Sequence, residues 1–142
     1  MILLDTNIIS EIMRPSRSLA AVRWLDAQPA RSLYISTLVL AELRFGLELV
    51  SSGAKRTALE EACQRIADEL FHDRILSFDR AASDHFGKLR AERRRVGKPI
   101  TTMDALIAAV ALSNSMTLAT RNTADFAGIG LSLVNPFEAA VP

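Results

Sequence analysis

Three acidic residues stand where the surrounding sequence is otherwise apolar, and they are the best candidates for chemistry in this chain. Asp5 follows the run Ile2 to Leu4, which is typical of a buried strand. Glu42 has apolar neighbours one helical turn away, and Asp104 is the one polar residue of the segment MDALIAAVAL. Three carboxylates gathered in a partly dry site would repel one another, so they imply a divalent cation.

Each acid also has a purely structural interpretation. Asp5, Thr6 and Asn7 are all good residues for starting a helix, and Asp104 would be stabilised by the helix dipole in a first turn. Glu42 is harder to explain, because a lone carboxylate on an apolar face must be protonated or find a partner. Asp5 stands at the carboxyl end of its strand, where open parallel sheets bind ligands. A crevice shared by the three acids is the functional alternative.

The other reactive residue types offer no competing site. His72 and His85 are far apart in sequence and have no cysteine partner, which argues against zinc and against a nucleophile and base pair. The single cysteine, Cys63, falls on the apolar side of a predicted helix and is interpreted as an inert core thiol. Oxygen ligands alone favour Mg²⁺ or Mn²⁺.

The elements that must position these acids follow from hydrophobic patterning. Short apolar runs alternate with helical patterns, which predicts an α/β fold around a parallel sheet. The predicted strands are Ile2 to Leu4, Leu33 to Ser36, Arg74 to Phe78, Thr117 to Ala119 and, more weakly patterned, Leu131 to Val134. The predicted helices are Thr6 to Met13, Leu19 to Ala27, Leu38 to Val50, Lys55 to Phe71, Arg80 to Val96 and one beginning near Met103.

Length and composition favour one soluble domain spanning residues 1–142. The longest apolar run, Ala105 to Leu112, is far too short to cross a membrane, and Asp5 interrupts the N-terminal run before it could serve as a signal peptide. The expected location is the cytoplasm. A net charge of +1 neither demands nor excludes a nucleic acid partner, so phosphate affinity would have to come from local clustering.

One segment carries such a cluster, KLRAERRRVGK from Lys88 to Lys98. The favoured interpretation is a solvated helix end, where Arg93, Arg94 and Arg95 also suit the negative pole of the helix. The alternative is a patch that contacts phosphate groups.

Four motifs in order resemble one protein family. They are LLDTN with Asp5, STLVLAEL ending with Glu42 and Leu43, TTMDALIAA with Asp104, and LATRNTADF near the C-terminus. Together they are similar to a PIN-domain ribonuclease, and more narrowly to the toxin subunit of a bacterial VapBC toxin–antitoxin pair, including the FitB-like branch. The resemblance covers nearly the whole chain.

The resemblance implies a three-layer α/β/α domain with a central parallel sheet of about five strands. It implies a metal-dependent endoribonuclease in which Asp5, Glu42 and Asp104 bind Mg²⁺ or Mn²⁺ and metal-activated water hydrolyses an RNA phosphodiester bond. It further implies a homodimer held inactive by a separate VapB-like antitoxin, with DNA contacted only through the antitoxin. Thr6, Asn7 and Thr120 are candidates for orienting the acids by hydrogen bonds.

The chain departs from the family pattern after the fourth strand, where many PIN domains have a further acid. This sequence has Thr120, Arg121 and Asn122. Asn122 could supply a neutral oxygen, and Asp125 one turn later could substitute for the missing charge; alternatively the two form a helix cap. With three acids a second metal ion would bind more weakly.

Two other functions remain open at this stage. A magnesium-dependent phosphatase or receiver-like domain also places acids at strand ends, but it normally has a second acid or a lysine beside the first. A catalytically weak PIN-like module that acts through an antitoxin, DNA or RNA complex would be consistent with Asn122. Arg14, Arg17, Arg121 and the Arg93 to Arg95 cluster are candidate RNA contacts.

Overall fold

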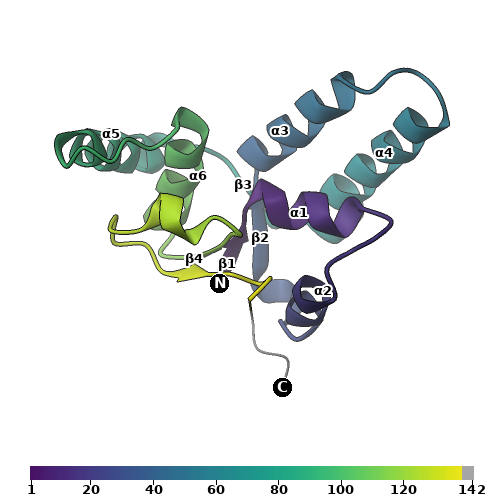
Figure 1. Ribbon diagram of the computed structural model, residues 1–142, viewed down its shortest axis with the longest axis horizontal. Helices are drawn as coiled ribbons and strands as arrows, with labels where there is room; N and C mark the ends of the chain where they lie inside the picture. Colours follow the sequence, from purple (N-terminus) through teal and green to yellow (C-terminus); the bar gives the residue numbers. More distant parts are fainter. Residues whose placement is uncertain (139–142) are drawn as a thin grey trace.

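A parallel sheet of five short strands runs through the centre of the computed structural model, which describes residues 1–138 (Figure 1). The strands are β1 (Ile2–Leu4), β2 (Leu33–Ser36), β3 (Ile75–Leu76), β4 (Thr117–Ala119) and β5 (Leu133–Val134). Every neighbouring pair is parallel. The predicted α/β class is confirmed. The predicted edge strands were too long, because β3 and β5 each pair over only two residues.

The strand order is β3-β2-β1-β4-β5, so the chain reverses direction across the sheet beside β1. It first builds outward from β1 to β2 and β3, and then returns to place β4 on the free side of β1. Ligands bind outside the carboxyl ends of the strands at such a reversal. Asp5 directly follows β1 and Thr120 directly follows β4, so the two stand on either side of this point.

Six α-helices flank the sheet, and three shorter helical segments lie between the elements. The α-helices are α1 (Thr6–Met13), α2 (Leu19–Asp26), α3 (Thr37–Glu48), α4 (Ala54–Arg65), α5 (Arg80–Arg95) and α6 (Thr102–Ser113). The short segments are η1 (Ala30–Ser32), η2 (Ile66–Leu70) and η3 (Thr123–Phe126). In Figure 1, α3 and α4 form an arm on one side, while α5 lies beside α6 on the other.

Polar residues just before the helices explain where several of them begin. The hydroxyls of Ser36 and Thr101 accept hydrogen bonds from the N–H groups of Val39 and Asp104, and the Asp79 carboxylate accepts one from Ala82 N–H. The predicted helix Lys55 to Phe71 is in fact two segments. After α4 the backbone widens into the π-helical η2, where Phe71 N–H reaches the carbonyl of Ile66.

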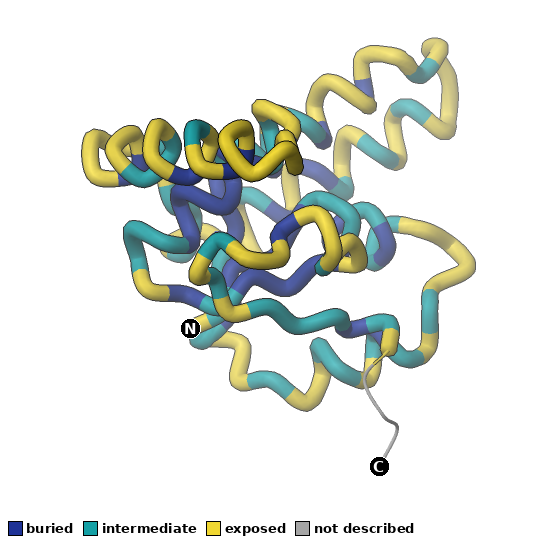
Figure 2. The backbone as a smooth tube through the Cα atoms, turned by 60° about the vertical axis from the view of Figure 1, so that its left-hand side comes forward, coloured by how far each residue is buried: buried dark blue, intermediate teal, exposed yellow. Residues whose placement is uncertain are grey.

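The core lies between the sheet and α6, whose side chains from Ala105 to Ala111 are almost all buried (Figure 2). This helix is apolar on nearly every side because α5 covers it opposite the sheet. Cys63 is also buried, in agreement with its prediction as a core thiol. No helix within residues 1–138 is long and apolar enough to span a membrane.

One member of the basic segment is part of this packing. Arg93 is 8% exposed, and its guanidinium donates hydrogen bonds to the carbonyl oxygens of Ala127 at 2.7 Å and Asp125 at 3.1 Å. Its Nε has no partner within the described residues. Arg93 therefore anchors the loop after β4 to α5, and the candidate role of this residue as an RNA contact is wrong.

Replacing Arg93 with Met should lower the free energy of unfolding by about 1–3 kcal/mol, since two carbonyl groups lose charge-assisted bonds. Urea denaturation measures this change. The matched control is Arg95→Met on the exposed face of the same turn, which should change stability by no more than about 0.5 kcal/mol. Equal effects of the two substitutions would contradict the anchoring role.

Candidate active site

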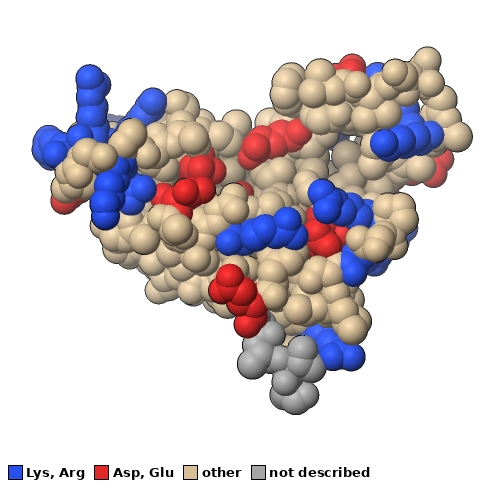
Figure 3. All heavy atoms as spheres, viewed as in Figure 1, with Lys and Arg blue, Asp and Glu red and all other residues tan. Residues whose placement is uncertain are grey.

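A cavity of about 340 Å³ opens at the carboxyl ends of β1 and β4. All three predicted acids line it, together with other polar side chains. The lining residues are Asp5, Thr6, Asn7, Ser10, Glu11, Arg14, Glu42, Asp104, Arg121 and Asn122. Figure 3 shows acidic side chains near the middle of one face of the molecule, with basic side chains on both sides of them.

The Asp5 carboxylate is held rigidly at the floor of this cavity. It is 5% exposed, and Thr6 N–H donates to Oδ1 at 2.8 Å. The Thr120 hydroxyl at 2.7 Å and the Asn7 amide at 3.0 Å both donate to Oδ2. A carboxylate has about four acceptor positions, so about one remains, on Oδ1. Asp5 is therefore fixed in orientation and has one oxygen available for a ligand.

The charge of Asp5 is disfavoured in this environment. Burial raises the pKa of Asp5, while the hydrogen bonds from Thr120 and Thr6 lower it, and the nearby charges of Asp104 and Glu42 raise it again. The net pKa lies above its ordinary value of 3.8. The three acids therefore interact electrostatically across the cavity.

Glu42 lies on α3 and finds its partner on α1. The Thr6 hydroxyl donates to Glu42 Oε1 at 2.7 Å. The face of α3 that carries Glu42 is apolar in composition but is not fully covered, since Phe45 is 67% exposed. Glu42 is thus half-buried at the edge of the cavity, where its carboxylate keeps access to solvent.

Asp104 is in the first turn of α6, one turn after the capping residue Thr101. Burial raises the pKa of Asp104 above 3.8, the Thr101 hydroxyl lowers it, and the charge of Asp125 raises it. Both interpretations of Asp104 therefore describe part of its environment: it suits the start of a helix, and its carboxylate lines the cavity.

Asn122 and Asp125, the two candidate ligands after β4, have different surroundings. Asn122 lines the cavity, and its backbone N–H donates to the Thr120 hydroxyl at 3.1 Å. Asn122 occupies the N-cap position of η3 and its carbonyl accepts a hydrogen bond from Asp125 N–H at 3.0 Å, but its side chain makes no capping hydrogen bond. Asp125 is exposed and is not among the lining residues, although its charge reaches Asp104.

Glu11, which was not predicted from the sequence, is 5% exposed and lines the same cavity. Ser18 N–H donates to its Oε1 at 2.6 Å, and Arg121 Nη2 donates to Oε2 at 3.2 Å. Arg14 Nη1 lies 3.7 Å from Oε2. The spacing in the sequence could have indicated this position, because Glu11 follows Asn7 by four residues and so lies on the same face of α1.

Arg121 is the most firmly positioned cation of the cavity. Its guanidinium carbon lies 3.8 Å from the centre of the Phe137 ring, and its Nη2 bonds to Glu11. Its backbone N–H donates to Asn7 Oδ1 at 3.2 Å. The Arg121 side chain is nevertheless 46% exposed, so several of its N–H donors remain available.

The lining residues suit a hard divalent cation in chemistry, because all the acidic donors are carboxylate oxygens and their charges destabilise one another. Within residues 1–138, no three His, Cys, Asp or Glu side chains converge closely enough to bind one ion together. Mg²⁺ does not require such a cage, since it commonly keeps several waters and binds through one or two carboxylates. Asp5, with one oxygen free, fits that manner of binding.

The raised pKa values predict how stability depends on pH without divalent ions. Below pH 3.8 both acids are protonated in the folded and unfolded states and impose no penalty. As pH rises through the interval between 3.8 and the raised native pKa values, the folded state retains protons that the unfolded state releases, so stability falls. The penalty then persists at neutral pH.

Asp104→Asn should therefore raise the melting temperature in EDTA at pH 7, and this gain should vanish below about pH 3.8. Thermal unfolding across this pH range measures the effect, with the exposed Asp26→Asn as the control. Destabilisation by Asp104→Asn at pH 7 would show that its charge is stabilising in the native state.

Comparison with known proteins agrees with this geometry. The PIN domain family model matches residues 2–130. The chain is 42% identical to the plasmid stability protein StbB of Pseudomonas syringae pv. tomato, and the match covers 98% of this chain and 100% of that relative. It is 39% identical to the VapC ribonuclease Y4jK of Sinorhizobium fredii, over 99% of this chain and 100% of that relative. It is also 39% identical to toxin FitB of Neisseria gonorrhoeae, over 97% of this chain and 99% of that relative.

The fold is also similar to that of solved structures. A structure of FitAB bound to an IR36 DNA fragment superimposes with a TM-score of 0.92 at 38% identity. The match covers 99% of each chain.

Proposed function

Since this chain belongs to the PIN-domain family, we propose that it acts as a metal-dependent endoribonuclease, the toxin of a type II toxin–antitoxin system. Residues 1–142 would act as one domain that hydrolyses RNA phosphodiester bonds in the cytoplasm. The ribonuclease and toxin names of its full-length relatives support this activity.

The observation that carries the proposal is the cavity at the strand reversal, which Asp5, Glu42 and Asp104 line from three separate segments of the chain. We propose that Asp5 binds Mg²⁺ or Mn²⁺ directly, and that Glu42 and Asp104 hold the ion through waters that it retains. The ion supplies Lewis acidity, which makes water a better nucleophile and stabilises charge that develops on the phosphate.

The protein's own contribution is orientation. Thr120 and Asn7 hold Oδ2 of Asp5, which leaves Oδ1 to face a ligand, and Thr6 holds Glu42 from the adjacent helix. No side chain needs to act as a nucleophile. Arg121, supported by the Phe137 ring, is placed to bind a phosphate oxygen and offset its charge.

The partners follow from the relatives. The structure of FitAB bound to a DNA fragment supports a complex with a VapB-like antitoxin. We propose that this chain contacts DNA only through that antitoxin. We also propose that the toxin forms a homodimer. The acidic cavity would be blocked by the antitoxin and exposed to RNA when the antitoxin is removed.

The direct test is cleavage of a mixed RNA pool by antitoxin-free protein with Mg²⁺, with Mn²⁺ and with EDTA. Asp5→Asn or Asp104→Asn should reduce cleavage by about 100-fold or more, because the cation contributes several kcal/mol to the transition state. Asp26→Asn is the matched control and should retain full activity. Cutting that persists in EDTA or in both site variants would refute the proposed site.

Asn122 supports a second candidate, a catalytically weak binding module, because a neutral side chain lines the cavity where a further acid is absent. A metal-binding measurement shows whether the site forms at all, and a cleavage assay then distinguishes a ribonuclease from a binding module. Millimolar Mg²⁺ or Mn²⁺ should raise the melting temperature of the native protein, and Asp104→Asn should reduce that shift. A full metal-induced shift without any RNA cleavage would favour the binding module.

Arg121→Ala should lower kcat/KM for RNA by about 10- to 100-fold, the usual effect of losing a charge-assisted hydrogen bond. Arg121→Lys should recover part of this loss, while the metal-induced shift in melting temperature stays unchanged in both variants. Arg23→Ala on the exposed part of α2 serves as the control. A loss of metal binding in Arg121→Ala would instead assign Arg121 a role in forming the site.

A further inference from the structure

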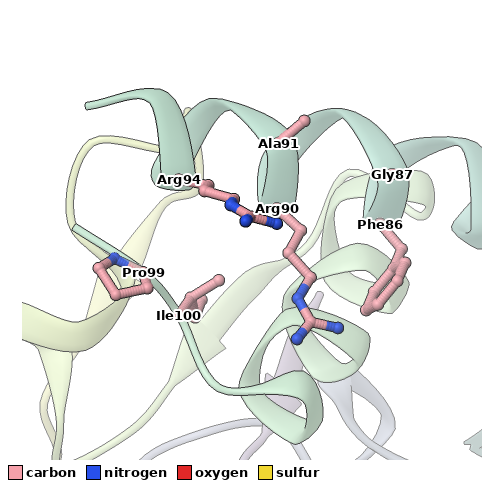
Figure 4. A pocket seen from close by; sticks show the side chains of 7 residues that line it. All are labelled: Phe86, Gly87, Arg90, Ala91, Arg94, Pro99 and Ile100. Atoms are coloured by element: carbon pink, nitrogen blue, oxygen red, sulfur yellow. The ribbon is translucent and has the colours of Figure 1, made fainter. Parts of the chain in front are cut away.

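A second and larger cavity lies away from the acids, between α5 and the segment that leads into α6. Its volume is about 670 Å³. Figure 4 shows Phe86, Arg90 and Arg94 on successive turns of α5, with Pro99 and Ile100 on the opposite side. We call it the Phe86 cavity.

The walls of the Phe86 cavity are apolar and include a ring held in place. Phe86 packs edge to face against Phe78, with ring centres 6.2 Å apart. Ile100 is buried and Pro99 is exposed across the cavity, so both offer apolar surface to an occupant. A flat ring could lie against these surfaces and bury them from water.

The rim of the same cavity is positively charged. The guanidinium of Arg90 lies 5.6 Å from the centre of the Phe86 ring, and Arg94 reaches into the cavity one turn later (Figure 4). Neither forms an ion pair within residues 1–138. Both exposed cations are therefore free for an anionic partner.

Charge is concentrated around this cavity. The segment from Lys88 to Lys98 contains six basic residues and one acid, whereas the whole chain has a net charge of +1. Because Arg93 is committed to the loop carbonyls, the exposed members of the segment create the local field. Such a field attracts a polyanion more strongly than a neutral or mixed protein surface.

We propose that the Phe86 cavity binds an unpaired nucleotide of the RNA substrate, an inference that rests on the proposed ribonuclease function. The base would lie against Phe86, Pro99 and Ile100, and Arg90 and Arg94 would pair with the flanking phosphates. Single-stranded nucleic acids are commonly bound in this way, by a basic groove with an aromatic platform.

The position of the cavity relative to the acids supports this occupant. Ile100 is followed by Thr101, which caps α6, and Asp104 lies in the first turn of that helix. Ile100 and Asp104 are four positions apart in the sequence, so their Cα atoms are at most about 14 Å apart. An RNA strand held at the Phe86 cavity would therefore reach the acidic cavity within a short stretch of chain.

The chemistry of the lining also indicates what this site contributes. Stacking on an aromatic ring and pairing with phosphates are available to every nucleotide, so they increase affinity without selecting a sequence. The Phe86 cavity thus favours single strands over duplexes, in which the bases are not accessible for stacking.

Fluorescence anisotropy with a labelled, unstructured RNA oligonucleotide in EDTA measures binding without cleavage. The double variant Arg90→Gln and Arg94→Gln should weaken binding by about 10-fold or more. Two phosphate contacts contribute about 1.4 to the slope of log K against log salt, so the slope should become shallower by about that amount. Phe86→Leu should weaken binding by about 10-fold and leave the slope unchanged.

The matched control is Arg23→Gln with Arg31→Gln, which removes the same charge from exposed positions outside the cavity. If control and cavity variants bind RNA equally, or if the unaltered protein binds no RNA, the proposal is overturned. A change in oligomeric state of the cavity variants on sizing chromatography, with RNA affinity unchanged, would assign the surface to a second protein chain and also overturn it.

Cleavage kinetics separate this proposal from the proposed function. Variants of the Phe86 cavity should raise KM and leave kcat within about twofold, whereas Asp5→Asn should abolish cutting while keeping RNA affinity in EDTA. If the unaltered protein binds RNA through Arg90 and Arg94 but never cuts it with metal, the ribonuclease function fails and the binding site stands.

Discussion

The candidate site depends on one hydrogen bond, from the Thr120 hydroxyl to Oδ2 of Asp5. It joins the ends of β1 and β4 at the point where the strand order reverses, and it determines which oxygen of Asp5 stays available. The Asn7 amide bonds to the same carboxylate and to Thr120, so strand ends and the first helix share one polar network. A buried network of this kind is stable only when its members are all satisfied. The core that supports the two strands therefore also determines the geometry of the acid.

Collecting negative charge for a cation creates a difficulty for an RNA substrate, which is itself an anion. The molecule separates the two requirements in space. Carboxylates occupy the floor of the smaller cavity, Arg121 stands at its rim, and further exposed cations lie on α5. The arginines of α5 differ in their surroundings. Arg93 is buried and donates hydrogen bonds to loop carbonyls, whereas Arg90 and Arg94 are exposed to solvent. Burial, rather than residue type, therefore distinguishes Arg93 from the exposed arginines of α5.

Much of this arrangement was predictable from sequence. Strands β1, β2 and β4 and the helix α1 have their predicted limits, because branched apolar runs end at strong helix starters. Their apolar surroundings made a crevice shared by Asp5, Glu42 and Asp104 one of two interpretations, and the resemblance to the PIN-domain family favoured it; all three residues do line one cavity. Sequence could not indicate that edge strands shorten, that α4 widens into η2, or that Glu11 is buried. Those features depend on contacts between distant segments, such as Arg121 with Glu11, which leave no local pattern.

The contact between Arg121 and the Phe137 ring joins two parts of the chain with different relations to the family match. The family match ends at residue 130, and Phe137 lies beyond it. The Phe137 ring therefore supports the cation from outside the matched region, whereas Asp5, Glu42 and Asp104 all lie within it. The carboxylates of the cavity and the aromatic support of its Arg121 guanidinium thus come from separate parts of the chain.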